Sequence, residues 1–253
     1  MERLALIALM MSFVGCASQP DPEMRTPVAA PAPRVTKLGT SVQGRPIEMI
    51  TFGPTTGRAA LIISGIHSGT EPTSVYVAEQ LVAHLRANPQ DAKRPIAIIV
   101  NVNPDASVAK TRGNANGVDV NRNFPAKNWK AVKNRTTYNG TAPSSEPESR
   151  LIQQAINSLN PDWIISIHSI DRGKHCNNFD GPARFLAETM AKHNGYPVTE
   201  TMGYPTPGSL GSWAGIDKQI PIVTLELPRQ DPGSVAWTQN KNALIAAIAT
   251  KRP

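Results

Sequence analysis

The strongest constraint on the fold of this chain comes from apolar runs that contain no alternating polar residues. The runs Ala97-Ile98-Ile99-Val100 and Trp163-Ile164-Ile165 are clear examples. A strand with one solvated face alternates apolar and polar side chains, whereas a strand that helices cover on both faces is apolar throughout. These runs therefore predict an α/β fold, with a largely parallel sheet between layers of helices.

Strand-like and helix-like patterns alternate along the chain from Arg34 onward. Short β-branched runs predict strands at residues 47–51, 60–64, 96–102, 163–168 and 222–227, and amphipathic spacing predicts helices at 73–87, 146–157, 183–193 and 242–250. The 253 residues less a short N-terminal segment leave about 220 to 240, which suits one large domain. We expect that domain to comprise residues 34–253.

Residues 1–15 have the pattern of a secretory signal. A short polar start precedes an apolar stretch of about eleven residues, too short to span the roughly twenty-residue core of a bilayer. The residues Val14-Gly15-Cys16 are similar to a bacterial lipobox, in which the cysteine becomes lipid-modified and N-terminal. This resemblance implies lipidation at Cys16, and a plain cleaved signal is the alternative.

Residues 16–33 are rich in Pro and Ala, which predicts an extended tether between the anchor and the folded domain. The expected location is the periplasm, with membrane attachment only through the lipid. Ala17 stands where an Asp would signal retention in the inner membrane, so the outer membrane is favoured.

Charge and composition narrow the class of partner. Lys and Arg total 26 against 19 Asp and Glu, a net charge of +7 that suits an anionic partner. Aromatic residues make up only 5% of the chain and no basic block is interleaved with them, so a nucleic-acid stacking surface is not expected. Two cysteines, Cys16 and Cys176, exclude a disulfide scaffold.

Polar side chains collect where apolar runs end. His67, Asn103 and His168 each follow such a run, and ligands of open α/β sheets bind beyond the carboxyl ends of the strands. With Glu71, the two histidines make a set of two imidazoles and one carboxylate. Such a set leaves the fourth position of a catalytic zinc open. The alternative is a pair of core or capping histidines.

Three further segments contain polar or aromatic side chains that a purely structural strand or loop would not require. Glu226 lies inside the apolar run 222–227, where a buried carboxylate is costly unless it is paired or functional. The loop 110–125 combines Asn with arginines whose planar donors suit a carboxylate. The loop 204–213 places turn residues around an aromatic side chain.

Taken together, these motifs resemble the zinc carboxypeptidase family typified by carboxypeptidase A, and most of all its bacterial murein peptide amidase branch. The agreement runs in order through NPD at 103–105, NGVDVNRNFP at 116–125, SEPE at 145–148, SIHS at 166–169, GSL at 208–210 with Trp213, and TLEL at 224–227. The long block at 116–125 is highly specific, whereas each short motif alone is weak.

The resemblance implies a single domain with a mixed, mostly parallel sheet of about eight strands flanked by helices. It also implies one Zn²⁺ per chain and a role for each matching residue. His67, Glu71 and His168 would hold the zinc. Arg112 would stabilise the oxyanion, and Asn121 with Arg122 would bind the terminal carboxylate of the substrate. Tyr204 would be the mobile tyrosine, and Glu226 would be the general base.

One spacing departs from the family pattern. Three residues separate His67 from Glu71, where the family has two. Zinc–ligand distances near 2 Å leave little slack, so the extra residue must be absorbed by the loop. We expect Gly69 to let the loop bulge and return Glu71 to the metal; a weakened or metal-free site is the alternative.

By resemblance, the expected activity is exo-acting hydrolysis of peptidoglycan stem peptides at the γ-D-glutamyl–meso-diaminopimelate bond, through a zinc-activated water. The alternatives are a D,L- or general L-peptide metallocarboxypeptidase and, in another class, a non-catalytic peptidoglycan-binding lipoprotein that has lost its metal. The sequence leaves the oligomeric state open, with a monomer favoured.

The other polar residues are expected to have no catalytic or binding role. His84 and His193 are expected to be solvated, and Glu146 and Glu148 to complement a helix dipole. The segment 171–181, which contains His175 and Cys176, is expected to be a plain loop, with a specificity pocket as the alternative.

Overall fold

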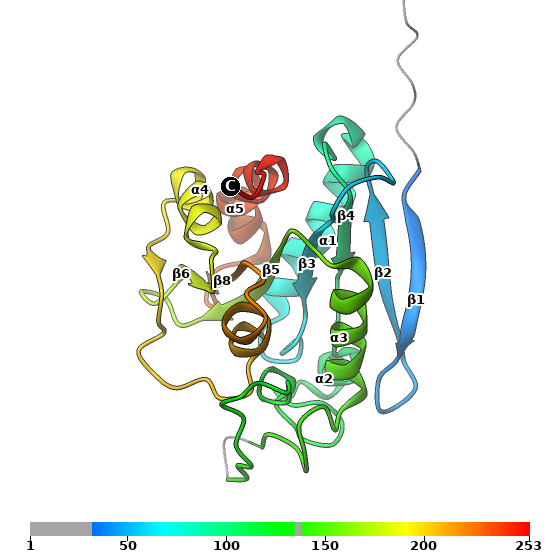
Figure 1. The fold of residues 1–253 in the computed structure, drawn as a ribbon, viewed down its shortest axis with the longest axis vertical. Coiled ribbons are helices and arrows are strands. Elements are labelled where there is room, and N and C mark those ends of the chain that lie inside the picture. Colours follow the sequence, from blue (N-terminus) through cyan, green and yellow to red (C-terminus); the bar gives the residue numbers. More distant parts are fainter. Residues whose placement is uncertain (1–31, 135–137) are drawn as a thin grey trace, which may run out of the picture.

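The computed structural model describes residues 32–134 and 138–253. In this part of the chain an eight-stranded sheet lies between helices (Figure 1). The expected signal at residues 1–15, the lipidation site Cys16 and nearly all of the tether lie outside the described residues. No helix among the described residues combines the length and apolar character needed to cross a membrane.

The strands form one sheet in the order β1-β2-β4-β3-β5-β8-β6-β7. Their bounds are β1 (Arg34–Thr40), β2 (Pro46–Phe52), β3 (Ala60–Ser64), β4 (Ile96–Ile99), β5 (Trp163–Ile170), β6 (Cys176–Asp180), β7 (Val198–Thr199) and β8 (Ile222–Pro228). The central strands β4, β3, β5 and β8 are parallel, and antiparallel pairing joins β1, β2 and β6 to them. The predicted mixed, mostly parallel sheet is confirmed.

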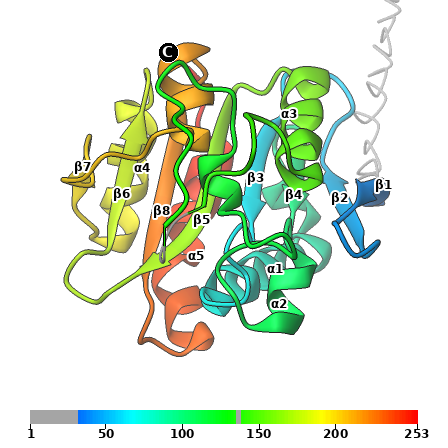
Figure 2. The ribbon, with the colours of Figure 1, turned by 90° about the horizontal axis from the view of Figure 1, so that it is seen from below.

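Helices cover both faces of the sheet (Figure 2). They are α1 (Pro72–Ala87), α2 (Pro104–Ala109), α3 (Pro147–Leu159), α4 (Arg184–Asn194) and α5 (Gly233–Ala249), with short turns η1 (Pro89–Asp91) and η2 (Val120–Arg122) and a π-helix, η3 (Gly211–Asp217). Ile62 and Ile165 pack with α1, α4 and α5, whereas Leu61 and Ile164 pack with α3 and η3. Both faces of the central strands are therefore buried, as the apolar runs predicted.

Several elements differ from the sequence-based expectation. β6 occupies the segment 171–181 that was expected to be a loop, so that prediction is wrong for residues 176–180. β6 contains two Asn and an Asp, yet it is buried because it pairs with β8. α5 begins at Gly233 rather than at residue 242, since its first turns carry polar side chains that hide the helical period. β1, β7 and α2 were not anticipated.

Parallel pairing in the centre of the sheet positions the site. β3, β5 and β8 lie side by side, so their carboxyl ends reach one edge. In the register of β5 with β8, His168 stands opposite Glu226. His67 follows β3, and Glu71 directly precedes α1, whose first residue Pro72 fixes the start of the helix.

Candidate active site

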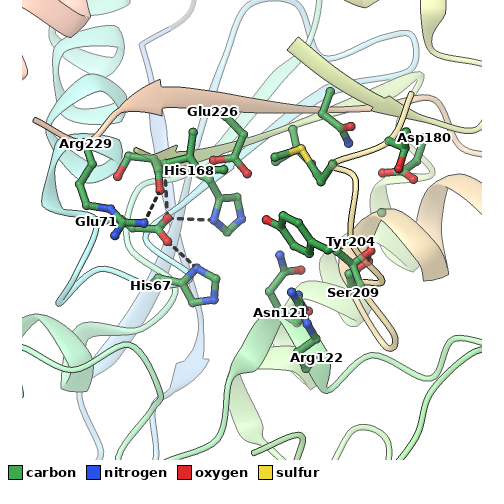
Figure 3. Close-up of a pocket in the computed structure, with 18 of the residues that line it drawn as sticks. His67, Glu71, Asn121, Arg122, His168, Asp180, Tyr204, Ser209, Glu226 and Arg229 are labelled. Carbon is green, nitrogen blue, oxygen red and sulfur yellow. Dashed lines mark hydrogen bonds and ion pairs between the residues drawn. The ribbon is translucent and has the colours of Figure 1, made fainter. Parts of the chain in front are cut away.

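Three buried side chains converge at the carboxyl edge of the sheet (Figure 3). Nδ1 of His67 lies 3.0 Å from Oε1 of Glu71, and Nδ1 of His168 lies 3.0 Å from Oε2 of the same carboxylate. One ligand atom from each residue lies within 4.8 Å of the others. Two imidazole nitrogens and one carboxylate, converging on one point beside a pocket, are a donor set that fits catalytic zinc.

The extra residue between His67 and Glu71 is absorbed by a tight turn. The backbone N–H groups of Thr70 and Glu71 both donate to the carbonyl of His67, at 3.0 and 2.9 Å. Gly69 packs against the backbone of α2 and of the residues that follow it, and a Cβ there would overlap the carbonyl oxygens of Ala106 and Thr111. The glycine thus supplies space, and Glu71 reaches both histidines.

Asn103 secures this turn from the side. Its side chain donates to the carbonyl of Ile66 and accepts from the N–H of Ala106, where it caps α2. Its own carbonyl accepts a hydrogen bond from the hydroxyl of Ser68. Asn103 therefore holds the loop that carries His67 and makes no contact with the metal group in the structure.

Asp119, which the sequence analysis gave no role, stands behind the metal group. Its Oδ1 lies 2.7 Å from Nε2 of His67, and its Oδ2 accepts from Nε of Arg112 at 3.0 Å. A carboxylate on the outer nitrogen keeps the proton there and leaves Nδ1 free to ligate. Burial acts to raise the pKa of Asp119, but His67 and Arg112 outweigh it and hold that pKa far below its usual range.

The charge states within the group favour a cation. Burial by itself would raise the pKa of Glu71, yet the facing histidines hold it well below its ordinary value. Burial likewise acts to lower the pKa of His67, but the carboxylates of Asp119 and Glu71 raise it overall. Glu71 is therefore an anion. A bound divalent cation can replace the histidine protons as the positive charge that balances it.

The expected clamp residues line the same pocket as the metal group. Oδ1 of Asn121 accepts from the N–H of Leu210 at 2.9 Å, which leaves its NH₂ group as a donor. The guanidinium of Arg122 donates to the carbonyl of Asn121 at 2.8 Å. Tyr204 lies near them on the loop 204–213 and is half exposed (Figure 3).

Arg112 lies against the metal group. It donates to Glu71 through Nη1, at 3.0 Å, and to Asp119 through Nε. Its side chain is 39% exposed and lines the pocket, so it still presents N–H groups to a ligand.

Glu226 stands beside His168 on the neighbouring strand and lines the pocket. Burial is the largest influence and raises its pKa; the charge of His168 opposes this and that of Glu71 adds to it. No hydrogen bond to its carboxylate is found among the described residues. A free carboxylate with a raised pKa can take up and return a proton.

Asp180 and Arg229 also line the pocket. Asp180 lies in the segment 171–181, for which a specificity pocket was the alternative interpretation, whereas the sequence analysis gave Arg229 no role. Asp180 ends β6, and burial raises its pKa to about 6. Its carboxylate has no hydrogen-bond or ion-pair partner among the described residues, and Gly211 leaves room for it because a Cβ there would overlap Oδ2. Asn178 and Asp180, which lie on the same face of β6, line the pocket, whereas His175 and Cys176 are not among its lining residues.

The remaining polar residues are structural. Glu146 and Glu148 both accept from the side-chain amide of Asn114, at 2.7 and 2.9 Å, which ties α3 to the loop 110–125. The expectation for His84 is wrong: its Nε2 lies 2.7 Å from Asp91, in a partly buried pair at the end of α1. His193 is exposed, as expected.

Comparison with known proteins agrees with this geometry. A family model described as zinc carboxypeptidase matches residues 29–174. The chain is also 32% identical over 212 residues to murein peptide amidase A of Escherichia coli (strain K12), an alignment that covers 78% of this chain and 82% of the relative. The chain belongs to the zinc carboxypeptidase family. It is therefore a hydrolytic enzyme whose cofactor is zinc.

Two solved structures are similar in fold. The murein-tripeptide amidase of Escherichia coli O157 superposes with a TM-score of 0.69 at 28% identity, covering 87% of this chain and 93% of that one. Carboxypeptidase A from Helicoverpa armigera gives a TM-score of 0.68 at 19% identity, covering 86% of this chain and 69% of that one. The second likeness shows the fold alone.

Proposed function

We propose that this enzyme hydrolyses peptidoglycan stem peptides at the bond between γ-D-glutamate and meso-diaminopimelate, and so releases the diamino acid end. The observation that carries the proposal is the unpartnered carboxylate of Asp180 in the pocket that also holds the metal group and the clamp. The similarity to murein peptide amidase A over most of both chains supports the same substrate class.

The pocket suits a released residue with two kinds of charge. Asn121 and Arg122 supply planar donors for a main-chain carboxylate. Asp180 offers an acid that no side chain of the described residues neutralises. A side-chain ammonium would both satisfy that acid and lower its raised pKa. Diaminopimelate has such an ammonium at the far end of its side chain.

His67, Glu71 and His168 would hold the zinc through Nδ1, a carboxylate oxygen and Nδ1. When bound, zinc polarises the scissile carbonyl and makes water at the site more acidic. Glu226 accepts a proton from the attacking water and returns it to the leaving amine, and its raised pKa suits both steps.

Arg112 stabilises the negative charge that develops on the carbonyl oxygen. Its contacts with Glu71 and Asp119 fix the guanidinium in place before substrate arrives, so little reorganisation is required. One well-placed donor of this kind contributes about 3 to 4 kcal/mol to the barrier reduction. Tyr204, half exposed on its loop, closes over the bound residue.

We also propose that Cys16 is lipid-modified and that the domain works in the periplasm at the outer membrane, tethered by residues 16–33. Metabolic labelling with an alkyne fatty acid should tag the wild-type protein and leave Cys16→Ser untagged. Membrane fractionation of the two proteins should show loss of membrane attachment for the variant.

The activity is tested with the zinc-loaded enzyme and the stem tripeptide L-Ala-γ-D-Glu-meso-diaminopimelate, with products read by mass spectrometry. Release of free diaminopimelate is the expected result. Faster cleavage of an L-peptide ending in Arg or Phe would indicate a general carboxypeptidase, and binding of murein peptides without any turnover would indicate a non-catalytic binder.

A further inference from the structure

Arg229 occupies a position on the pocket wall that the proposed chemistry does not use. It follows β8, three residues after Glu226, and its backbone N–H donates to the carbonyl of Ile170 at 2.7 Å. Its Nη2 donates to the carbonyl of Ser169 at 3.2 Å, and the N–H of Ser169 donates to Glu71 at 3.1 Å. The guanidinium is therefore held next to the metal group and lines the same pocket.

Arg229 forms one long ion pair among the described residues. Its ion-pair partner is Asp171, whose carboxylate lies 3.8 Å away and is 62% exposed, so water screens that pair. The Arg229 side chain is itself 41% exposed and uses one of its N–H donors on Ser169. The rest of its donor fork is available to a ligand.

Arg229 and Asp180 lie on opposite sides of the metal group (Figure 3). Asn121, Arg122 and Tyr204 lie on the side of Asp180. The clamp holds the carboxylate of the released residue, and the reacting carbonyl must reach the metal group and Glu226. The acyl half of the substrate consequently leaves the site on the side of Arg229.

A γ-linked glutamate differs from an α-linked residue on that half. Its side-chain carboxyl forms the scissile amide, and its α-carboxylate remains free a few bonds away. An ordinary peptide has no main-chain charge at that point. The planar fork of an arginine matches such a carboxylate in a bidentate arrangement.

We propose that Arg229 binds the free α-carboxylate of the γ-linked glutamate, and that this contact makes the enzyme selective for γ-linked acyl groups. The inference rests on the proposed function and adds a specificity residue on the side of the bond opposite to the clamp.

The test compares two tripeptides that differ in one group: L-Ala-γ-D-Glu-meso-diaminopimelate and its analogue in which the α-carboxylate of the glutamate is a carboxamide. Wild-type kcat/KM should be about 10- to 100-fold higher for the free acid, as expected for one charge-assisted contact. Arg229→Gln should lose that preference by slowing the free acid alone, and Arg229→Lys should keep part of it.

Arg172→Gln is the matched control. Arg172 is an exposed arginine near Arg229 in space, since its backbone N–H donates to the side chain of Gln230. Its guanidinium binds Asp231, and it does not line the pocket. This variant makes the same change in net charge and should keep the wild-type preference.

Equal rates of the wild-type enzyme on both tripeptides would overturn the inference and leave the proposed function standing; this comparison requires no variant to fold. An undiminished preference in Arg229→Gln would overturn it equally. If the zinc-loaded wild-type enzyme cleaves neither tripeptide, the proposed function is wrong and the inference is wrong with it.

Discussion

Replacing Asp180 with Asn should stabilise the substrate-free protein while it removes the proposed preference for a diamino acid. Asp180 is a buried carboxyl without a partner among the described residues, and burial raises its pKa from 3.8 to about 6. Asn has nearly the same shape and no charge, so the change removes the cost of burying the anion without opening a cavity.

The size and pH dependence of the effect follow from the two pKa values. A group that binds its proton more tightly when folded favours folding below its unfolded pKa, and this advantage disappears as the pH rises through the folded pKa. The cost of Asp180 is therefore absent below pH 3.8 and complete above about pH 6. A shift of about two units corresponds to roughly 3 kcal/mol at most, and water in the pocket reduces our expectation to about 1 to 2 kcal/mol.

The assay is urea unfolding of metal-free wild type and Asp180→Asn at several pH values between 4 and 8, because zinc binding has a pH dependence of its own. The variant should be more stable by about 1 to 2 kcal/mol at pH 8, and the difference should nearly vanish at pH 4. Glu188→Gln, an exposed acid on α4, serves as the control and should change little.

Activity should change in the opposite direction. Asp180→Asn should lower kcat/KM for the diaminopimelate tripeptide by about 10- to 100-fold, as expected when a charge-assisted contact is removed. Hydrolysis of a tripeptide ending in an uncharged residue should change little. A variant that is no more stable at pH 8, or equally more stable at pH 4 and pH 8, would refute the reasoning about the buried anion.

Other predictions concern the metal group and the base. Gly69→Ala should lower both zinc content and thermal stability, because its Cβ would overlap the carbonyl of Ala106; full zinc occupancy at the wild-type Tm would contradict this. Asp119→Asn should weaken zinc binding about 10- to 100-fold in a competition titration with a chromogenic chelator, since the outer nitrogen of His67 loses its charged partner. Glu226→Gln should keep one zinc per chain and lose turnover, and a retained rate would exclude Glu226 as the base. A chelator should abolish activity and added Zn²⁺ should restore it; activity that survives full metal removal would contradict the zinc mechanism.

The central part of the fold could be predicted because its signal is local. The buried strands β3 and β4 are almost entirely apolar, and β5 and β8 contain apolar runs interrupted by a few polar residues, a pattern typical of strands covered on both faces. β1 and β6 were missed because their residues are polar or mixed, and pairing with a neighbour decides their conformation.

The candidate site was likewise predictable only in part: the sequence identifies its main residues but not how they come together. His67, His168 and Glu226 stand out from the sequence because each adjoins or interrupts an apolar run, and Glu71 stands out because it lies close to His67 where a strand is followed by a helix. The structure then brings them together through the register of β5 with β8 and the turn that ends at Glu71.

What the sequence determined by itself is the class of fold and the chemistry of the groups at the strand ends, since both depend on residue type and on spacing over a few positions. What only the tertiary structure decided is which charged groups share the pocket. No pattern of neighbouring residues singles out Asp180 or Arg229. They line the pocket because β6 pairs with β8 and the chain after β8 returns to β5. Such contacts join residues far apart in the chain, so only the packing of the whole domain determines them.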